Sequence, residues 1–112
     1  MLVSTRDIRD AHVRNTAGED LGAIESLVLD AVSGQVIYAV LGYGGILGYG
    51  EKLFAIPWEA ITLRPEEREV IIDAARERLE SDPGFDRNQW PRQGDWTLIT
   101  GGSWSGRWDL SV

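Results

Sequence analysis

The stretch "QVIYAVLGYGGILGYGEKLFAIPW", residues 35–58, contains two apolar runs separated by a glycine-rich loop. β-Branched and aromatic residues dominate the first run, which predicts a strand over residues 35–43. Its apolar side chains alternate onto both faces, with one set at Val36, Tyr38 and Val40 and the other at Ile37, Ala39 and Leu41. A strand that is apolar on both faces is expected to be covered on both sides.

The second run, residues 51–58, also alternates in the manner of a strand. Leu53 and Ala55 occupy one face, and the opposite face carries Phe54, Ile56 and Trp58. Pro57 should close this strand, because proline has no N–H to donate to a ladder.

The loop between the two runs comes close to a phosphate-binding pattern. Gly45 and Gly50 have the required spacing, but Glu51 precedes Lys52, and Leu53 stands where a serine or threonine would ligate magnesium. A strand rather than a helix is expected to follow. We therefore interpret the loop as a structural corner between two strands.

Three apolar residues, Ile46, Leu47 and Tyr49, lie at the predicted tip of this corner. Apolar side chains at a loop tip are usually covered by another surface. These residues are therefore predicted to lie in an interface.

The remaining segments read as short elements with turns between them. Residues 11–13 and 21–30 are predicted strands joined by the turn "NTAG" at 15–18, since asparagine and glycine tolerate positive φ. Short strands at this spacing favour a small barrel or sandwich. Residues 64–85 stay ambiguous: helical spacing favours one amphipathic helix, while a β-branched cluster at residues 70–72 favours a strand followed by a short helix.

From residue 86 the composition changes, and four of the five tryptophans lie beyond this point among Gly, Ser and Asp. We expect a domain over residues 1–85 and a separate tail over 86–112. The pair Gly101–Gly102 predicts a β-hairpin turn within the tail. An isolated hairpin is marginally stable in water, so the tail is expected to dock on another surface. The tryptophans assigned to that contact are Trp96, Trp104 and Trp108.

Composition argues against several function classes. The 18 acidic and 11 basic residues give a formal charge of −7 and a pI near 4.6, which opposes binding to nucleic acid or to anionic lipid. There is no cysteine, and thus no disulfide or thiolate site. The longest apolar region is too short and too rich in glycine for a membrane-spanning helix, and no signal peptide is predicted. We expect a cytoplasmic protein.

Candidate catalytic residues are few. His12 is the only histidine, so one chain cannot assemble a Ser-His-Asp triad or a histidine metal triad, and we expect this residue on an edge strand. Glu66, Glu67 and Glu69 are surrounded by arginines, as in a solvated, self-compensating face. We assign no catalytic, metal-binding or cofactor-binding residue.

Three segments together resemble the PRC-barrel family, which occurs in the H subunit of photosynthetic reaction centres and in a ribosome maturation factor. They are residues 18–30, 33–61 and 76–91, and they are similar to the free-standing bacterial branch of the family. The resemblance implies an all-β fold, a barrel of about six strands, with residues 70–73 as a strand and 76–81 as a short helix. It also implies a binding or assembly module without shared catalytic residues. The tail beyond Pro91 departs from the family pattern.

Two functions follow from these observations. The first is a non-enzymatic protein-interaction module that forms a dimer or larger assembly through Ile46, Leu47 and Tyr49 and through the tail tryptophans, with a further protein partner that is unknown. The second is a barrel that binds a small ligand, with the aromatic tail closing the pocket.

Overall fold

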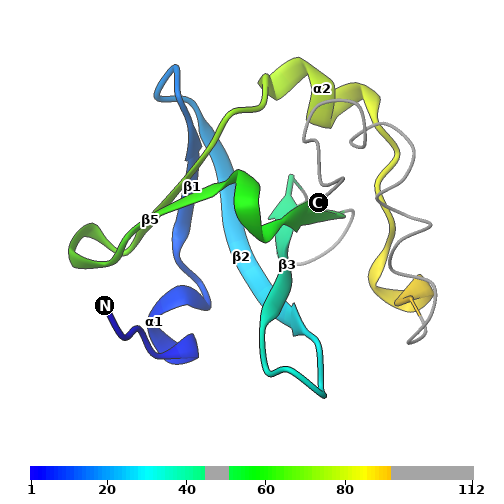
Figure 1. The fold of residues 1–112 in the computed structure, drawn as a ribbon. Coiled ribbons are helices and arrows are strands. Elements are labelled where there is room, and N and C mark those ends of the chain that lie inside the picture. The colour runs from blue at the N-terminus through cyan, green and yellow to red at the C-terminus, as the bar shows by residue number, and fades with distance from the viewer. Residues whose placement is uncertain (45–50, 92–112) are drawn as a thin grey trace.

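The computed structural model describes residues 1–44 and 51–91, and its fold is mostly β (Figure 1). In chain order the elements are α1 (Thr5–Ile8), β1 (His12–Asn15), β2 (Asp20–Leu29), β3 (Val36–Tyr43), β4 (Lys52–Pro57), η1 (Trp58–Ala60), β5 (Ile61–Arg64), η2 (Pro65–Glu67), β6 (Glu69–Ile72), α2 (Arg76–Ser81) and η3 (Arg87–Gln89). The expected fold class, a small barrel of about six strands with a short helix, is confirmed. The predicted hairpin of the tail lies outside the described residues.

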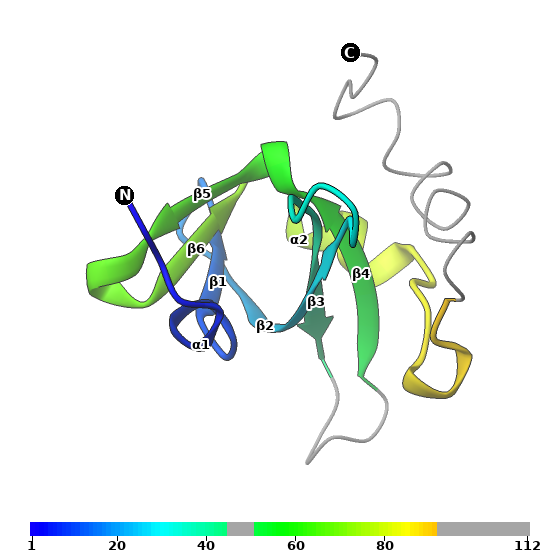
Figure 2. The same ribbon diagram turned by 60° about the horizontal axis from the view of Figure 1, so that its bottom comes forward.

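The six strands form one sheet in the order β4-β3-β2-β1-β6-β5. Neighbouring strands are antiparallel except β1 and β6, which run parallel. Figure 2 shows the sheet curled around a common interior, with β5 and β6 on one side and β3 and β4 on the other. The sheet is thus a half-barrel in which β1 and β6, the first and last strands in chain order, lie side by side.

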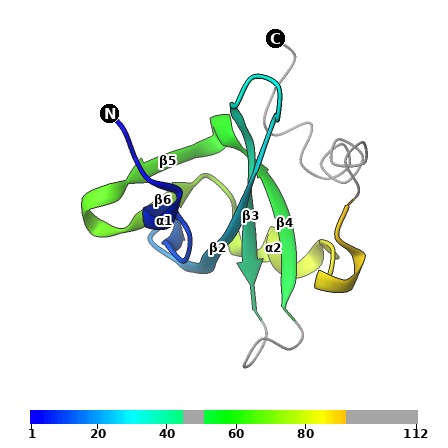
Figure 3. The same ribbon diagram turned by 90° about the horizontal axis from the view of Figure 1, so that it is seen from below.

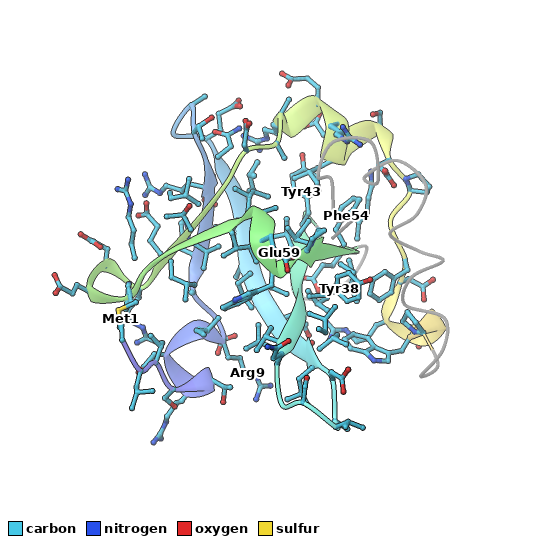
Figure 4. All side chains as sticks on the ribbon, viewed as in Figure 1. Met1, Arg9, Tyr38, Tyr43, Phe54 and Glu59 are labelled. Carbon is cyan, nitrogen blue, oxygen red and sulfur yellow. The ribbon has the colours of Figure 1, made fainter. Side chains whose placement is uncertain are left out.

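The predicted strands at the glycine loop are confirmed, and β4 ends at Pro57 as expected. The two faces of β3 enter different clusters. Ala39, Leu41 and Tyr43 join the main core inside the barrel, with Phe54 and Ile56 of β4. The opposite face contributes to a smaller outer cluster, which consists of Tyr38, Val40, Leu53, Ala55 and Phe85. Figure 4 labels Tyr38, Tyr43 and Phe54 around β3 and β4. Both faces of β3 are therefore covered from Tyr38 to Tyr43, as the sequence predicts, whereas Ile37 at the start of the strand is exposed.

The segment after β5 resolves the ambiguity at residues 64–85. Arg68 has a left-handed backbone, with φ of 52°, which ends η2 and redirects the chain. The β-branched residues that follow pair with β1 on one side and β5 on the other. The helix is confined to Arg76–Ser81. The implied strand and short helix are confirmed, and the single amphipathic helix is wrong because strand pairing on both sides overrides its spacing.

The expectation of an edge position for His12 is also wrong. β1 lies between β2 and β6, and His12 pairs with Ala23 on one side and with Glu69 on the other. The imidazole itself is exposed, with Nε2 3.0 Å from the Asp20 carboxylate. A parallel partner 57 positions later in the chain cannot be inferred from local sequence, so local reasoning assigns the strand to an edge.

β2 passes very close to β3 where two glycines meet. Gly22 has φ of +130°, and a Cβ atom at this position would lie 2.0 Å from the carbonyl oxygen of Gly42. No side chain fits in that space. The close approach of β2 to β3 is possible only because residue 22 has no side chain.

The chain beyond α2 crosses the outside of the sheet. The backbone N–H of Phe85 donates to the Leu53 carbonyl at 2.9 Å, and the Leu53 N–H donates to the Phe85 carbonyl at 2.8 Å. Phe85 thereby covers the outer cluster at the edge of β4. We call residues 82–91 the strap. Its first residues lie beside β4 in yellow, whereas α1 lies near β1 and β2 (Figures 2 and 3).

Candidate functional site

The most distinctive surface begins where β2 extends beyond the end of the neighbouring strand β1. β2 has ten residues and β1 has four, and their register ends at His12 and Ala23. Ile24 still exchanges two backbone hydrogen bonds with the segment before β1. It accepts from the Asp10 N–H at 2.8 Å and donates to the Ala11 carbonyl at 3.0 Å. Beyond Ile24, β3 is the one described strand that pairs with β2.

Residues 25–29 therefore lack a described partner strand on one side, although β2 is an inner strand of the sheet. In an antiparallel pair, every second residue turns its N–H and C=O away from its partner strand. On the side away from β3, no backbone–backbone hydrogen bond joins residues 25–29 to another segment within residues 1–44 and 51–91. A bulge interrupts the β2–β3 register between Ile24 and Ser26, which leaves Glu25 as the extra residue. We call residues 25–29 the β2 free edge.

An open groove of about 770 Å³ lies over this edge. α1 contributes one wall, and the strap contributes the other. The lining residues are Thr5, Arg6, Arg9, Asp10, Glu25, Ser26, Leu27, Leu29, Arg87 and Trp90. Figure 4 labels Arg9 beside α1, near the lower part of β2.

Both walls are held in place by local contacts. On α1, the buried side chain of Ile8 packs into the main core, and the Ser4 hydroxyl caps the helix by accepting from the Arg6 N–H at 3.1 Å. On the strap, the Arg87 guanidinium donates to the carboxylates of Glu25 and Glu51, the latter at 2.7 Å. Arg87 thus ties the strap to β2 and to the start of β4.

The charges of the groove differ from those of the chain as a whole. Hydrogen bonding to Glu25, reinforced by its charge, raises the pKa of Arg87, so this cation is satisfied within the protein. Arg6 and Arg9 are exposed, and neither forms an ion pair with a described residue. Against three arginines the lining carries two carboxylates, Asp10 and Glu25. The groove is therefore locally cationic on a chain of formal charge −7.

The far end of the groove is apolar. Leu29 is 53% exposed and Trp90 is 42% exposed. The Trp90 ring meets Phe85 edge-on, with 5.7 Å between ring centroids, so the outer cluster supports it from below. Ser26 on the β2 free edge has a buried hydroxyl oxygen without a hydrogen-bond partner in the described parts of the chain. The surface combines cations, backbone edge and exposed apolar side chains.

A second polar cluster fixes α2 to the barrel. The Lys52 ammonium donates to the carbonyl oxygens of Leu79, Glu80 and Asp82 at 3.1, 2.7 and 3.2 Å. The Tyr43 hydroxyl donates to Glu80 at 2.9 Å. Burial raises the pKa of Tyr43, and the neighbouring Arg76 partly opposes that shift. These groups act as a structural clamp, because every donor is occupied by the helix end that it holds.

The sequence-predicted interface residues lie outside the described residues. Ile46, Leu47 and Tyr49 fall in the segment 45–50, and Trp96, Trp104 and Trp108 fall in 92–112. The structure does establish that the glycine loop connects an antiparallel pair, because Tyr43 pairs with Lys52. This topology agrees with our interpretation of the loop as a structural corner rather than a phosphate-binding loop. The Lys52 ammonium binds carbonyl oxygens at the end of α2 instead.

Sequence reasoning missed the groove, although one signal was present. The predicted strands at 11–13 and 21–30 differ in length, so part of the longer one has to lack a partner on one side. The position of α1 and of the strap gives no comparable signal. No group of three or more His, Asp or Glu side chains in the described ranges could hold a metal ion, and no described helix is long and apolar enough to cross a membrane.

Comparison with known proteins identifies the family of the chain through one family model. The model of the PRC-barrel domain matches residues 2–79. Among curated proteins, none matches the chain. A similar solved structure is that of RimM from Pseudomonas aeruginosa, a protein assigned to 16S ribosomal RNA processing, with 13% identity and a TM-score of 0.46. The match covers 67% of this chain and 45% of that protein, so the chain spans less than half of its length.

Proposed function

This chain belongs to the PRC-barrel family, and from that premise we propose that it is a non-enzymatic protein-interaction module. The observation that carries the proposal is the contrast between the interior and the outside of the barrel. The interior is filled by side chains of the main core, whereas the open groove of about 770 Å³ lies on the outside, between α1 and the strap. Such a surface suits contact with another macromolecule.

A small-ligand barrel is less well supported. Among the described residues, the hollow that borders the main core beside Val3 and Leu63 measures only about 10 Å³, which is room for one water molecule at most. Ligand pockets usually enclose several hundred cubic ångströms. A ligand would need more space than this hollow between the described residues offers.

Self-association is the specific mode that the sequence favours. Ile46, Leu47 and Tyr49 are apolar residues in the segment of the sequence between β3 and β4, and the tail adds Trp96, Trp104 and Trp108. Apolar and aromatic side chains are the usual centre of a subunit interface. A protein partner is favoured over nucleic acid because the chain carries a formal charge of −7.

Light scattering on the full chain tests this proposal. We expect a dimer or larger species at micromolar concentration, and Leu47→Asp should shift it toward the monomer. Val32→Asp is the matched control, because it places the same charge at a valine that is 98% exposed in another turn. A monomer at micromolar concentration in both the parent and Leu47→Asp proteins would count against self-association.

A further inference from the structure

We propose that the β2 free edge, residues 25–29, accepts an extended acidic segment of a partner protein as an added strand. The proposal rests on the interaction function proposed above and names its site and the chemistry of the partner. The segment would lie where β1 would continue if it were as long as β2. Three independent observations support it, namely the backbone edge, the charge of the walls and the exposed apolar end.

The backbone edge supplies the first argument. An unpaired strand edge is a template for an extended chain, because its N–H and C=O groups already have strand geometry. Proteins usually blunt such edges with a covering loop or helix. Here the β2 free edge lies at the floor of an open groove, and α1 stops beside it instead of covering it. Five residues at about 3.4 Å each offer an edge of about 17 Å, enough for one short strand.

The charged residues in the walls of the groove favour an acidic strand. Arg6 and Arg9 flank the edge without carboxylate partners in the described ranges, whereas Glu25 is already paired with Arg87. Asp10 is the one lining carboxylate that forms no ion pair with another residue in the described part of the chain. An acidic segment therefore finds two cations against one like charge. Elsewhere the chain is strongly acidic and repels the same segment, which confines it to the groove.

The apolar end of the groove favours apolar residues in the bound segment. Leu29 and Trp90 are exposed at the groove, and alternate residues of an added strand would face this side. A segment that alternates carboxylates with apolar residues satisfies both the arginines and this end. A nucleic acid does not, because its backbone has no N–H and C=O groups at strand spacing for the β2 free edge and no alternating apolar side chains for Leu29 and Trp90.

The probe is a capped heptapeptide that alternates glutamate and valine, titrated into the uniformly nitrogen-15-labelled full chain. We expect saturable amide shifts at residues 25–29 and in α1. Replacing the peptide's glutamates by glutamines should weaken binding about ten-fold, since a few charge contacts of up to about 1 kcal/mol each are lost. Equal binding of the two peptides, or no saturable shift at millimolar peptide, overturns the proposal.

Charge-reversal variants of the protein test which arginines bind the acidic peptide. The double variant Arg6→Glu/Arg9→Glu should lose affinity for the glutamate peptide by about ten-fold or more. The double variant Arg64→Glu/Arg68→Glu is the charge-matched control, because both arginines lie outside the groove, at the end of β5 and just after η2, and neither forms an ion pair with a described residue. Equal losses in the two variants would reduce the effect to net charge and refute the site.

N-Methylated peptides test the added strand itself without altering the protein. Methyl groups on one alternating set of peptide nitrogens should abolish binding, and methyl groups on the other set should leave it intact, because only one edge of the peptide pairs with β2. Identical behaviour of both peptides refutes strand addition. A uridine oligonucleotide that bound the groove more tightly than the glutamate peptide would also overturn the proposal.

Hydrogen exchange in the protein alone tests whether the edge is available. We expect at least one amide among residues 25–29 to exchange rapidly. Slow exchange throughout would mean that this chain or a second copy occupies the edge, which contradicts the proposal. The outcome is separable from self-association, since a dimer sensitive to Leu47→Asp that ignores the peptide retains the interaction module and removes only this site.

Discussion

Gly22→Ala should destabilise the barrel severely. The backbone at Gly22 has φ of +130°, a region that other residues occupy at a cost of about 1–3 kcal/mol. The new Cβ would lie 2.0 Å from the Gly42 carbonyl oxygen, so one backbone has to move by about 1 Å or more to reach ordinary contact distance. That movement disturbs the ladder at the Ala23–Gly42 pair, where each lost hydrogen bond costs about 1 kcal/mol. Together these effects predict a loss of about 4 kcal/mol, a large part of the 5–15 kcal/mol typical of a domain.

Urea denaturation followed by far-ultraviolet circular dichroism measures this loss. The matched control is Gly34→Ala, in the turn between β2 and β3, because Gly34 also has a positive φ of +77° but its added Cβ meets nothing within 4 Å. The control should lose only about 1 kcal/mol, the cost of a left-handed backbone without a clash. If Gly22→Ala were no more destabilising than Gly34→Ala, the close approach of β2 and β3 would not be a constraint in solution, and the reasoning would fail.

Two further predictions concern the strap and the clamp. Phe85→Ala should cost about 3 kcal/mol in urea denaturation, because it uncovers the outer cluster; a loss below about 1 kcal/mol would show that other residues cover these side chains. The raised pKa of Tyr43 means that the folded state holds this proton more tightly than the unfolded state does, so its contribution is complete below about pH 10 and is lost as the pH rises through the folded pKa. Stability measured from pH 8 to 11 should therefore fall less steeply in Tyr43→Phe than in the parent, and parallel curves would contradict the assignment.

Local sequence was sufficient for the strands at the glycine loop. The alternation in β3 and β4 records two covered faces, and the structure fills one face with the main core and the other with Phe85 and its neighbours. Pro57 marks the end of β4 through a missing donor, which is a local property. Such features are encoded within a few residues and can be read without knowledge of the fold.

Features that depend on distant partners were not accessible in the same way. The residues of β6 satisfy helical spacing as well as a strand pattern, and only pairing with β1 and β5 decides between them. α1 and β5 have four residues each, too few for a periodic signal. The groove requires knowledge of where β1 stops along β2 and where the strap crosses, so its arginines and Trp90 look unremarkable in the sequence.

The parallel pairing of β1 with β6 has a consequence for the order of folding. β1 can form a hairpin with β2 as soon as both strands have been synthesised, but its other partner follows only after β3, β4 and β5. Contacts between distant segments form slowly, because the intervening chain must first lose its conformational freedom. During synthesis, the side of β1 that later pairs with β6 therefore remains an exposed edge until β6 has been made. We expect the folding rate to report this late pairing of β1 with β6, which joins β1–β4 to β5 and β6, rather than the formation of either early hairpin.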